Sequence, residues 1–391
     1  MAAPAHNGPA LTAELKAHAD DVRAHIIART HDAGGFLPFD VFMHEALYAP
    51  ALGYYVAGLR KFGRDGDFVT APEVSPLFGR VIARNCAPIL DALQTSTIVE
   101  YGPGSGALAD AVIGWFAERE RSLDYRLVEV SPDLAARQRA RLEHWTQQPQ
   151  ITLDWFDDPT TQTIRGVVLG NEVADALPVR RFRRTATGFD ELGLAADGDA
   201  LRIAERSAPS TVAADLAALE QRRGSPFPPG YTSEYCPALA NWVTAVVRTV
   251  DAGLVLLCDY GAGASEYYAD ERYDGTFRCH FRHQAIDDPL FAPGLVDMTA
   301  WVDFTTLAEA GVAAGSTLTG FTTQAGFLLG GGLTDECRGD LSADEQLRQA
   351  AALKTLTLPG EMGERFRFIG FERGTLPPVA GFGFQDLRYS L

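Results

Sequence analysis

Short apolar runs alternate with segments of helical periodicity from residue 96 to about residue 179. The runs predict strands, and the periodic segments predict helices. In chain order these segments are 97–99, 107–119, 126–130, 132–145, 151–155 and 166–169. Such alternation predicts an α/β, Rossmann-like fold, in which a parallel sheet is wound with helices on both faces. A continuous apolar run at 253–259 predicts one more buried strand, and later strands are expected at 318–322 and 366–371.

The chain on either side of this pattern has a different character. Residues 1–95 carry helical periodicity and then a loop-rich stretch, so we expect an N-terminal helical and loop cap. We expect residues 96–391 to form the core, interrupted by an insertion at about 179–250. At the start of the insertion the apolar period changes to two, with turn signals at Gly188 and at Asp197-Gly198, which predicts a β-hairpin.

Three glycines, Gly102, Gly104 and Gly106, stand at alternate positions between a predicted strand and a predicted helix. Glycine is needed where the chain turns sharply after a strand and where its backbone approaches a ligand closely. The helix expected to begin near Ala107 presents free N–H groups to an anionic part of that ligand. The loop, which includes Ser105, therefore predicts a nucleotide-type cofactor site, and the alternative is a glycine-rich turn without a ligand.

Two further residues extend this prediction. Glu129 follows the second predicted strand, at the position from which an acidic side chain can accept both hydroxyls of a ribose. Trp155 ends the third predicted strand and can either stack on a base or pack in the core. The loop and the acid together predict a Rossmann-like nucleoside site.

Two classes of cofactor fit these residues. Gly102, Gly104 and Ala107 match the fingerprint of a dinucleotide site, which would suit a nicotinamide-dependent oxidoreductase. Glu100, at the end of the strand before the loop, favours S-adenosylmethionine instead. An anion beside a pyrophosphate is unfavourable, whereas an anion near the ammonium of a methionine moiety is favourable.

A third polar segment follows the fourth predicted strand, on the side of an open sheet where ligands bind. It contains Asn171, Glu172 and Asp175. If the segment is helical, the two acids lie three residues apart and can face one substrate group together. Two carboxylates suit a guanidinium, whose planar fork of donors they can hold. The alternative is a helix N-terminus capped by Asn171, with both acids in the first turn.

Two other segments carry weaker signals. Residues 63–73, which include Thr70, have the polar and irregular character of a loop that covers a ligand, or of a surface turn before a helix. Cys279, His280 and His283 have a spacing that allows metal binding, but no second ligand pair accompanies them, so we expect no metal site.

Composition narrows the choice of function. The formal net charge of −17 opposes general binding to DNA or RNA, whose affinity depends on phosphate contacts. The first ten residues lack an apolar core stretch, and no run in the chain approaches membrane-spanning length. The five cysteines are scattered and odd in number, as expected in a reducing compartment. We therefore expect a cytoplasmic protein with no stable membrane insertion and an oligomeric state that the sequence does not reveal.

An ordered set of motifs gives a more specific prediction. The chain resembles the MidA family of class I methyltransferases from about Phe36 to Phe371. The motifs that carry the resemblance are Gly-Asp-Phe-Val-Thr-Ala-Pro-Glu at 66–73, Glu-Tyr-Gly-Pro-Gly-Ser-Gly at 100–106, Asn-Glu-Val-Ala-Asp-Ala-Leu-Pro at 171–178, Cys-Asp-Tyr-Gly at 258–261, Gly-Thr-Phe-Arg-Cys-His at 275–280 and Leu-Val-Asp-Met-Thr-Ala-Trp-Val-Asp-Phe at 295–304. One departure is Ala71, where family members often carry serine.

The resemblance implies a seven-stranded core that binds S-adenosylmethionine, with added helical and β insertions. Mitochondrial members act as assembly factors for respiratory complex I and methylate an arginine of one of its subunits. By resemblance, the three glycines line the methionine end of the cofactor, Glu129 the ribose, and residues 171–178 the substrate. The absence of a transit-like segment makes a bacterial-type member the natural reading.

These residues suggest a chemical role for the acidic segment. An arginine nitrogen is a poor nucleophile, because its lone pair is delocalised and its pKa exceeds about 12. Glu172 and Asp175 are expected to orient the guanidinium and to stabilise charge during methyl transfer, with Asn171 holding one of them. The alternatives are an assembly chaperone that binds the cofactor with little or no turnover, and the nicotinamide-dependent oxidoreductase named above.

Overall fold

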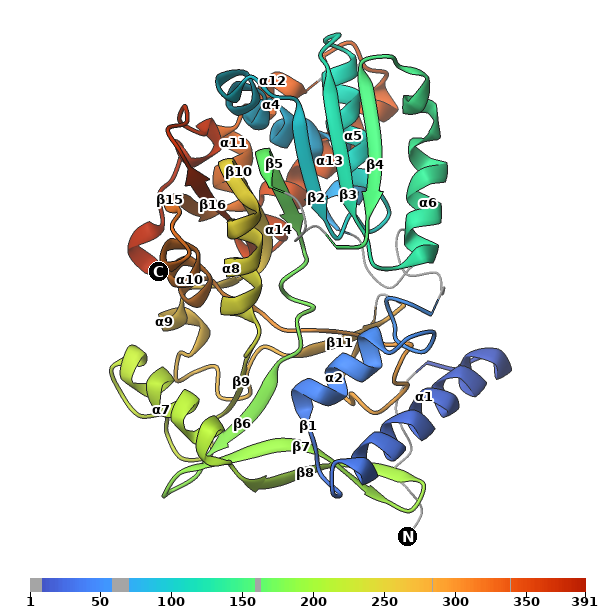
Figure 1. The fold of residues 1–391 in the computed structure, drawn as a ribbon, viewed down its shortest axis with the longest axis vertical. Helices are drawn as coiled ribbons and strands as arrows, with labels where there is room; N and C mark the ends of the chain where they lie inside the picture. The colour runs from blue at the N-terminus through green and yellow to red at the C-terminus, as the bar shows by residue number, and fades with distance from the viewer. Residues whose placement is uncertain (1–8, 58–69, 159–162, 283, 338) are drawn as a thin grey trace.

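The computed structural model describes residues 9–57, 70–158, 163–282, 284–337 and 339–391. These residues form two lobes, one above the other in Figure 1. The larger lobe is built on a mostly parallel sheet, and the smaller lobe is built on an antiparallel one. The chain passes between the lobes several times, so neither lobe is a continuous segment.

The sheet of the larger lobe has the order β15-β16-β10-β5-β2-β3-β4. Its strands are β2 (Thr97–Tyr101), β3 (Leu123–Val128), β4 (Ile151–Phe156), β5 (Ile164–Asn171), β10 (Val250–Ala262), β15 (Thr317–Thr323) and β16 (Phe366–Arg373). The strands from β4 to β10 are parallel, and β16 runs antiparallel to both β10 and β15. Within the described residues an eighth strand, β14 (Val302–Asp303), pairs with the end of β10 that extends beyond β5.

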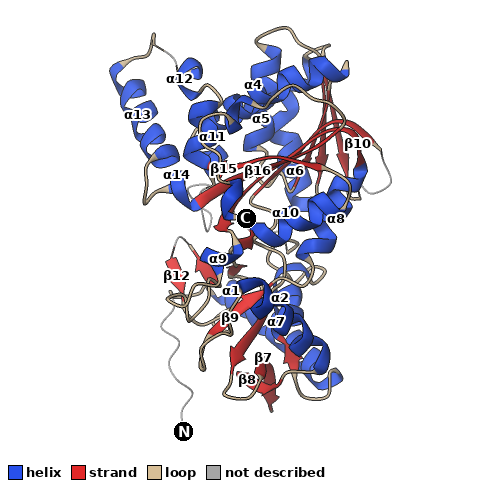
Figure 2. Ribbon diagram, turned by 90° about the vertical axis from the view of Figure 1, so that its left-hand side faces the viewer, coloured by secondary structure: helices blue, strands red, loops and turns tan. Residues whose placement is uncertain are grey.

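Helices cover both faces of this sheet, as the apolar runs predict. In β10, Leu254, Leu256 and Cys258 join the core on one face, while Val255 and Leu257 join the core on the other. Figure 2 shows helices on the two sides of the strands. The helices of the larger lobe are α3 (Ala71–Val74), α4 (Pro76–Leu93), α5 (Ala107–Ala117), α6 (Pro132–Leu142), α8 (Leu239–Thr249), α10 (Phe304–Ala313), α11 (Gln324–Gly330), α12 (Leu333–Glu336), α13 (Ala343–Thr357) and α14 (Met362–Arg365).

The smaller lobe combines the N-terminal region with the predicted insertion. Its elements are α1 (Ala13–Asp32), β1 (Leu37–Pro38), α2 (Phe39–Tyr48), β6 (Arg180–Arg184), β7 (Phe189–Asp197), β8 (Ala200–Ser207), α7 (Ser210–Arg223), β9 (Thr232–Tyr235), α9 (Ala264–Tyr267), β11 (Arg278–Phe281), β12 (Gln284–Ile286) and β13 (Asp297–Thr299). Strand β1 pairs with β7 through Leu37 and Leu194, so residues far apart in the sequence share one sheet.

Two sequence expectations differ from this arrangement. The predicted hairpin is part of a larger sheet, because β7 pairs with β1 and β6 as well as with β8. The expected boundary at residue 95 lies after α4, yet α4 packs in the same core as α5 and the sheet. The apolar face of α4, which includes Phe78 and Ile82, is buried against α5 and the sheet, so this helix belongs to the larger lobe.

Candidate active site

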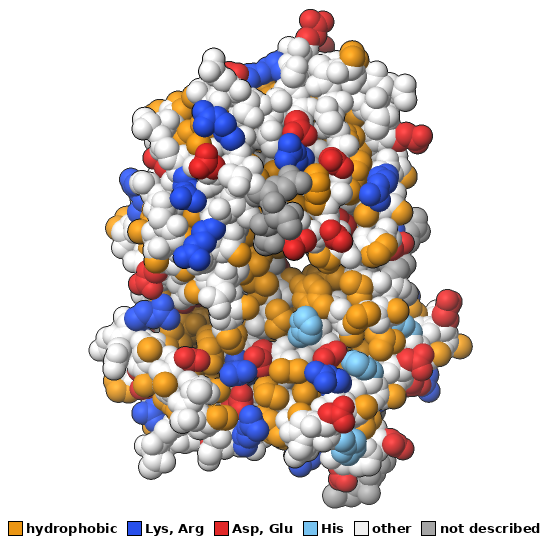
Figure 3. Space-filling model, in the orientation of Figure 1, with side chains coloured by type: hydrophobic (Ala, Val, Ile, Leu, Met, Phe, Trp, Pro, Cys, Tyr) orange, Lys and Arg blue, Asp and Glu red, His pale blue; other side chains and the backbone are white. Residues whose placement is uncertain are grey.

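A cavity of about 970 Å³ lies between the two lobes. Figure 3 shows hydrophobic side chains gathered around a hollow at the waist of the molecule. The described residues that line the cavity include Glu100, Glu129 and Glu172, but no lysine and no arginine. The cavity therefore favours a cationic ligand over a pyrophosphate.

The glycine loop forms one end of this cavity and has the geometry predicted for it. It connects β2 to α5, and Gly102, Gly104 and Gly106 adopt the left-handed φ angles of 59°, 54° and 80°. These angles favour glycine, because other side chains are strained there. A Cβ on Gly102 would also lie 3.1 Å from Val173, so the loop is closely packed as well.

Glu129 lines the cavity directly after β3, and its carboxylate is held in place from two sides. The Ser131 N–H donates to Glu129 Oε1 at 2.8 Å. The Nε2 of Gln138, a fully buried side chain on α6, donates to Glu129 Oε2 at 2.8 Å and to the carbonyl of Gly104 at 2.9 Å. Gln138 therefore joins the glycine loop to the predicted ribose acid.

The sequence did not single out Gln138, because a glutamine within a helical pattern carries no signal by itself. Its role depends on the packing of α6 against the loop. Trp155 supports the same glutamine, since its Nε1 donates to Gln138 Oε1 at 3.1 Å. Trp155 is not among the described residues that line the cavity; it packs at the edge of the core with the Arg139 guanidinium 4.8 Å from its ring centroid. Its position favours the packing alternative over base stacking.

Glu100 lies at the carboxyl end of β2 and reaches the cavity, although it is only 2% exposed. It accepts a hydrogen bond from the Tyr125 hydroxyl at 2.6 Å. Burial raises the pKa of Glu100 to about 7 despite this bond, and the nearby charge of Glu129 adds to the increase. A cation bound beside it would restore the carboxylate form.

Thr70 and Pro72 also line the cavity, at the start of α3. Glu73 on α3 accepts hydrogen bonds from the Ser105 hydroxyl and from Arg141 Nη1, the latter at 3.2 Å. These bonds fasten α3 to the glycine loop. Residues 63–69 of the predicted covering loop lie outside the described residues.

The segment from Asn171 to Pro178 is not helical, so the helical arrangement considered for its two acids does not occur. Glu172 has a φ of 54°, in the left-handed region that a residue with a side chain rarely adopts, and this ends the regular backbone after β5. Asn171 and Glu172 line the cavity, whereas the buried Asp175 is not among the described lining residues. The two acids still interact, but Glu172 is the one that faces the ligand space.

The backbone of this segment is held by Asp259, which directly follows the apolar residues of β10. Its Oδ2 accepts the N–H groups of Val173, Ala174 and Asp175 at 3.1, 2.9 and 3.3 Å. Parallel pairing of β5 and β10 places Cys258 opposite Asn171, which puts Asp259 beside the segment. The sequence analysis included Asp259 in the Cys-Asp-Tyr-Gly motif, but only the register of β5 against β10 shows that this aspartate bonds the segment after β5.

The acids at this end of the cavity are buried and close to one another. Burial raises the pKa of Glu172 to about 8, and the charge of Asp175 adds to the effect. Burial also raises the pKa of Asp175 and that of Asp259. Within the described residues, the buried Oδ1 atoms of Asn171 and Asp175 have no hydrogen-bond partner. Buried acceptors without donors are costly, so this end favours a ligand that brings several N–H groups.

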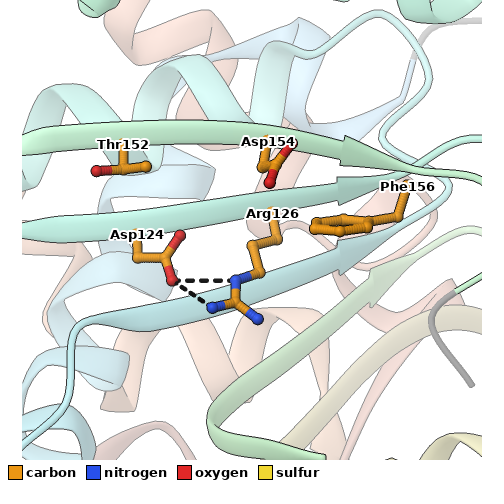
Figure 4. Close-up of a pocket in the computed structure, with 5 residues that line it drawn as sticks. All are labelled: Asp124, Arg126, Thr152, Asp154 and Phe156. Carbon is orange, nitrogen blue, oxygen red and sulfur yellow. Dashed lines mark hydrogen bonds and ion pairs between the residues drawn. The ribbon is translucent and has the colours of Figure 1, made fainter. Parts of the chain in front are cut away.

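The other candidate positions lie elsewhere. Cys279 is a buried residue of β11, and His283 lies outside the described residues; in the described part of the chain no group of three ligand-type side chains could hold a metal ion. Figure 4 shows a second hollow, on the surface of β3 and β4. There Arg126 donates twice to Asp124, at 3.0 and 2.8 Å, and none of the predicted site residues lines this hollow.

Comparisons with known proteins agree with this geometry. A family described as S-adenosyl-L-methionine-dependent methyltransferases matches residues 81–322. The protein arginine methyltransferase NDUFAF7, mitochondrial, of Danio rerio is 30% identical, with 89% of each chain covered. The protein of the same name from Xenopus laevis is 29% identical and covers 92% of this chain and 88% of its own length.

A solved structure is similar along almost the whole chain. It is a superfamily member from Burkholderia thailandensis bound to S-adenosyl-homocysteine, with 38% sequence identity and a TM-score of 0.89. The match covers 98% of this chain and 100% of the other. Its bound product is that of an S-adenosylmethionine-dependent reaction, which confirms the expected cofactor class over the nicotinamide alternative.

The comparisons also correct one expectation. The curated relatives from Danio rerio, Xenopus laevis and Drosophila melanogaster are named as mitochondrial proteins, which contradicts the predicted cytoplasmic location. That prediction rested on the composition of the first ten residues and on the scattered, odd number of cysteines. In the described part of the chain, no helix is both long and apolar enough to cross a membrane.

The family match over residues 81–322 and the relative at 30% identity lead to one conclusion. The chain belongs to the MidA-type family of S-adenosylmethionine-dependent methyltransferases.

Proposed function

We propose that this methyltransferase methylates an arginine side chain of a protein, with Glu172 and Asn171 holding the guanidinium and the buried Asp175 adding negative charge beside Glu172. The observation that carries the proposal is the acidic end of the cavity. Glu172 and Asn171 line it, and the buried Oδ1 of Asn171 has no hydrogen-bond partner among the described residues. A guanidinium brings five N–H donors and a permanent positive charge, which match these acceptors.

The other end of the cavity suits the cofactor. S-adenosylmethionine, when bound, supplies a methyl group activated by a sulfonium. The backbone of Gly102, Gly104 and Gly106 allows close approach of the ligand, and Glu129 is oriented to accept ribose hydroxyls. Glu100 would face the ammonium of the methionine moiety. Ser105 and Thr70 complete the proposed cofactor site. Glu73 on α3, the helix that follows Thr70, accepts a hydrogen bond from the Ser105 hydroxyl.

Glu172 would have two tasks in the reaction. Its carboxylate form holds one guanidinium nitrogen toward the cofactor end of the same cavity. When that nitrogen forms its bond to the methyl carbon, the bond from this carbon to the sulfonium sulfur would break and leave a neutral thioether, and the nitrogen would lose a proton, which Glu172 can accept. A pKa near 8 suits this acceptor role at neutral pH better than the ordinary value of 4.5.

The protein substrate is the finer part of the proposal. The relatives carry the name protein arginine methyltransferase, and the family resemblance implies a subunit of respiratory complex I as the acceptor. The net charge of −17 is compatible with a basic partner surface. A client that is bound but never methylated would instead indicate the assembly chaperone.

The test uses purified protein, tritium-labelled S-adenosylmethionine, and a protein extract from cells that lack this gene. We expect labelled methylarginine after hydrolysis of the acceptor proteins, and no labelled methyllysine. Glu172→Gln and Asp175→Asn should keep cofactor affinity while methyl transfer falls by roughly 100-fold or more, the scale of a lost electrostatic contact. The matched control is Glu143→Gln, an exposed position outside the cavity. Wild-type rates in both acid variants would contradict the proposal.

A further inference from the structure

A row of aromatic rings leads from the surface of the smaller lobe toward the buried acids. His44 and Tyr48 lie on α2, and Tyr55 lies in the segment that follows it. The ring centroids of His44 and Tyr48 are 5.7 Å apart, and those of Tyr48 and Tyr55 are 5.5 Å apart with planes only 23° from parallel. All three residues line the cavity, and His44 is exposed.

Both tyrosines are held by their hydroxyl groups. The Tyr48 hydroxyl donates to the carbonyl of Ala176 at 3.0 Å, and the Tyr55 hydroxyl donates to Asp297 Oδ1 at 2.9 Å. The first bond holds the backbone one residue after Asp175, and the second reaches β13. Both rings are therefore fixed, and Tyr48 joins the smaller lobe to the acidic segment.

This role differs from ordinary core packing. The adjacent Tyr54 fills the core of the smaller lobe, where it is 1% exposed and meets Tyr55 edge-on at 5.0 Å. Tyr48 and Tyr55 are only partly buried, and both contribute to the cavity wall. Burial raises the pKa of each phenol, so both rings stay neutral and electron-rich at physiological pH.

We propose that Tyr48 and Tyr55 form the wall on which the substrate side chain lies, and that this wall makes the site prefer a guanidinium to an ammonium. The inference rests on the proposed function and names its specificity residues. A planar guanidinium stacks on aromatic faces and is weakly hydrated, whereas an ammonium is compact and strongly hydrated. The row ends near Glu172, whose carboxylate lines the cavity and can meet the planar fork of donors.

The test measures two small probes by NMR titration of the enzyme loaded with S-adenosylhomocysteine. The probes are butylguanidinium and butylammonium, which share charge and chain length. We expect wild type to bind the guanidinium at least tenfold more tightly. Tyr48→Leu and Tyr55→Leu, which remove a ring, should weaken guanidinium binding about tenfold and reduce the preference, because the stacking contact between cation and ring is lost.

Two further variants separate the ring from its hydroxyl. Tyr48→Phe and Tyr55→Phe keep the ring and should bind butylguanidinium within about threefold of wild type. Affinity for S-adenosylhomocysteine should stay unchanged in all four variants. The matched control is Tyr235→Leu, a tyrosine of the smaller lobe that is not among the described residues lining the cavity.

Several outcomes would overturn the proposal. If the leucine variants bind butylguanidinium as tightly as wild type, Tyr48 and Tyr55 do not contribute to guanidinium recognition. A wild type without preference between the probes would refute the inference even if no variant folded. Failure of the proposed function gives a different result, in which the probe preference and its loss in the leucine variants are observed but no arginine is methylated.

Discussion

Replacing Glu172 by glutamine should make the ligand-free protein more stable at alkaline pH while it abolishes methyl transfer. The amide keeps the shape of the side chain but cannot ionise. In the folded protein, burial first and the charge of Asp175 second raise the pKa of Glu172 from 4.5 to about 8. The carboxyl group therefore favours folding while it is protonated. This advantage is complete below pH 4.5 and is lost as the pH rises to about 8.

The size of the effect follows from the same pKa. At about 1.36 kcal/mol per pKa unit, the increase corresponds to about 5 kcal/mol once the group is ionised. The side chain is partly exposed to the cavity, so solvent screening reduces this energy. We expect Glu172→Gln to raise the free energy of unfolding by about 1–2 kcal/mol at pH 8.5, and to change it little near pH 4.5.

Urea unfolding of the ligand-free protein at both pH values measures this difference, and methyl transfer is measured on the same preparations. Glu143→Gln is the control for a surface carboxyl group, and it should change neither stability nor rate. A variant that is less stable at pH 8.5, or that is shifted equally at both pH values, would refute the reasoning. Higher stability together with lost activity would show that the acid is retained for the reaction rather than for the fold.

Four other predictions concern the cofactor site, the reaction and the core. Gly104→Val should abolish binding of S-adenosylmethionine in calorimetry, because the φ of 54° at Gly104 strains a residue with a side chain. A variant with wild-type affinity would show that the loop does not bind the cofactor. Gln138→Met keeps the side-chain volume but loses the bonds to Gly104 and Glu129, so cofactor affinity should fall about tenfold; an unchanged value would show that Glu129 needs no support. The rate at low substrate concentration should rise with pH up to about 8 as Glu172 ionises, and a flat profile from pH 6 to 9 would argue against its role as a carboxylate. In the core, Asn85→Ala should cost about 2–3 kcal/mol in urea unfolding, because Asn85 bonds Val81, Gly331 and Gly381, and a loss below about 1 kcal/mol would contradict this assignment.

The local pattern of apolar residues was sufficient to predict the strands of the large sheet that are buried on both faces. The apolar run of β10 is continuous because alternate residues enter the cores on the two faces of the sheet. A strand of this kind can be recognised from its own sequence, without knowledge of its neighbours. The glycine loop was equally local, since a strand, three glycines and a helix follow one another directly. The sequence could place Glu129 and Glu172 on the ligand side of the sheet, because each directly follows the carboxyl end of a parallel strand.

The remaining features depend on contacts between distant segments. Asp259 organises a backbone that lies more than eighty residues earlier, and only the register of β5 against β10 brings them together. The segment at residues 171–178 is not helical, and the N–H groups of Val173, Ala174 and Asp175 donate to this aspartate. Tyr48 belongs to a helix of the other lobe, so no spacing in the sequence links it to Ala176.

The strand order of the two sheets also determines when the protein can become functional during synthesis. Strand β1 must wait for β7, because Leu37 pairs with Leu194. Strand β16 is made last, yet it lies between β10 and β15 in the finished sheet. Closing such long loops slows folding, and until then apolar faces stay exposed. A nascent chain therefore cannot complete the sheet of the larger lobe until β16 has left the ribosome.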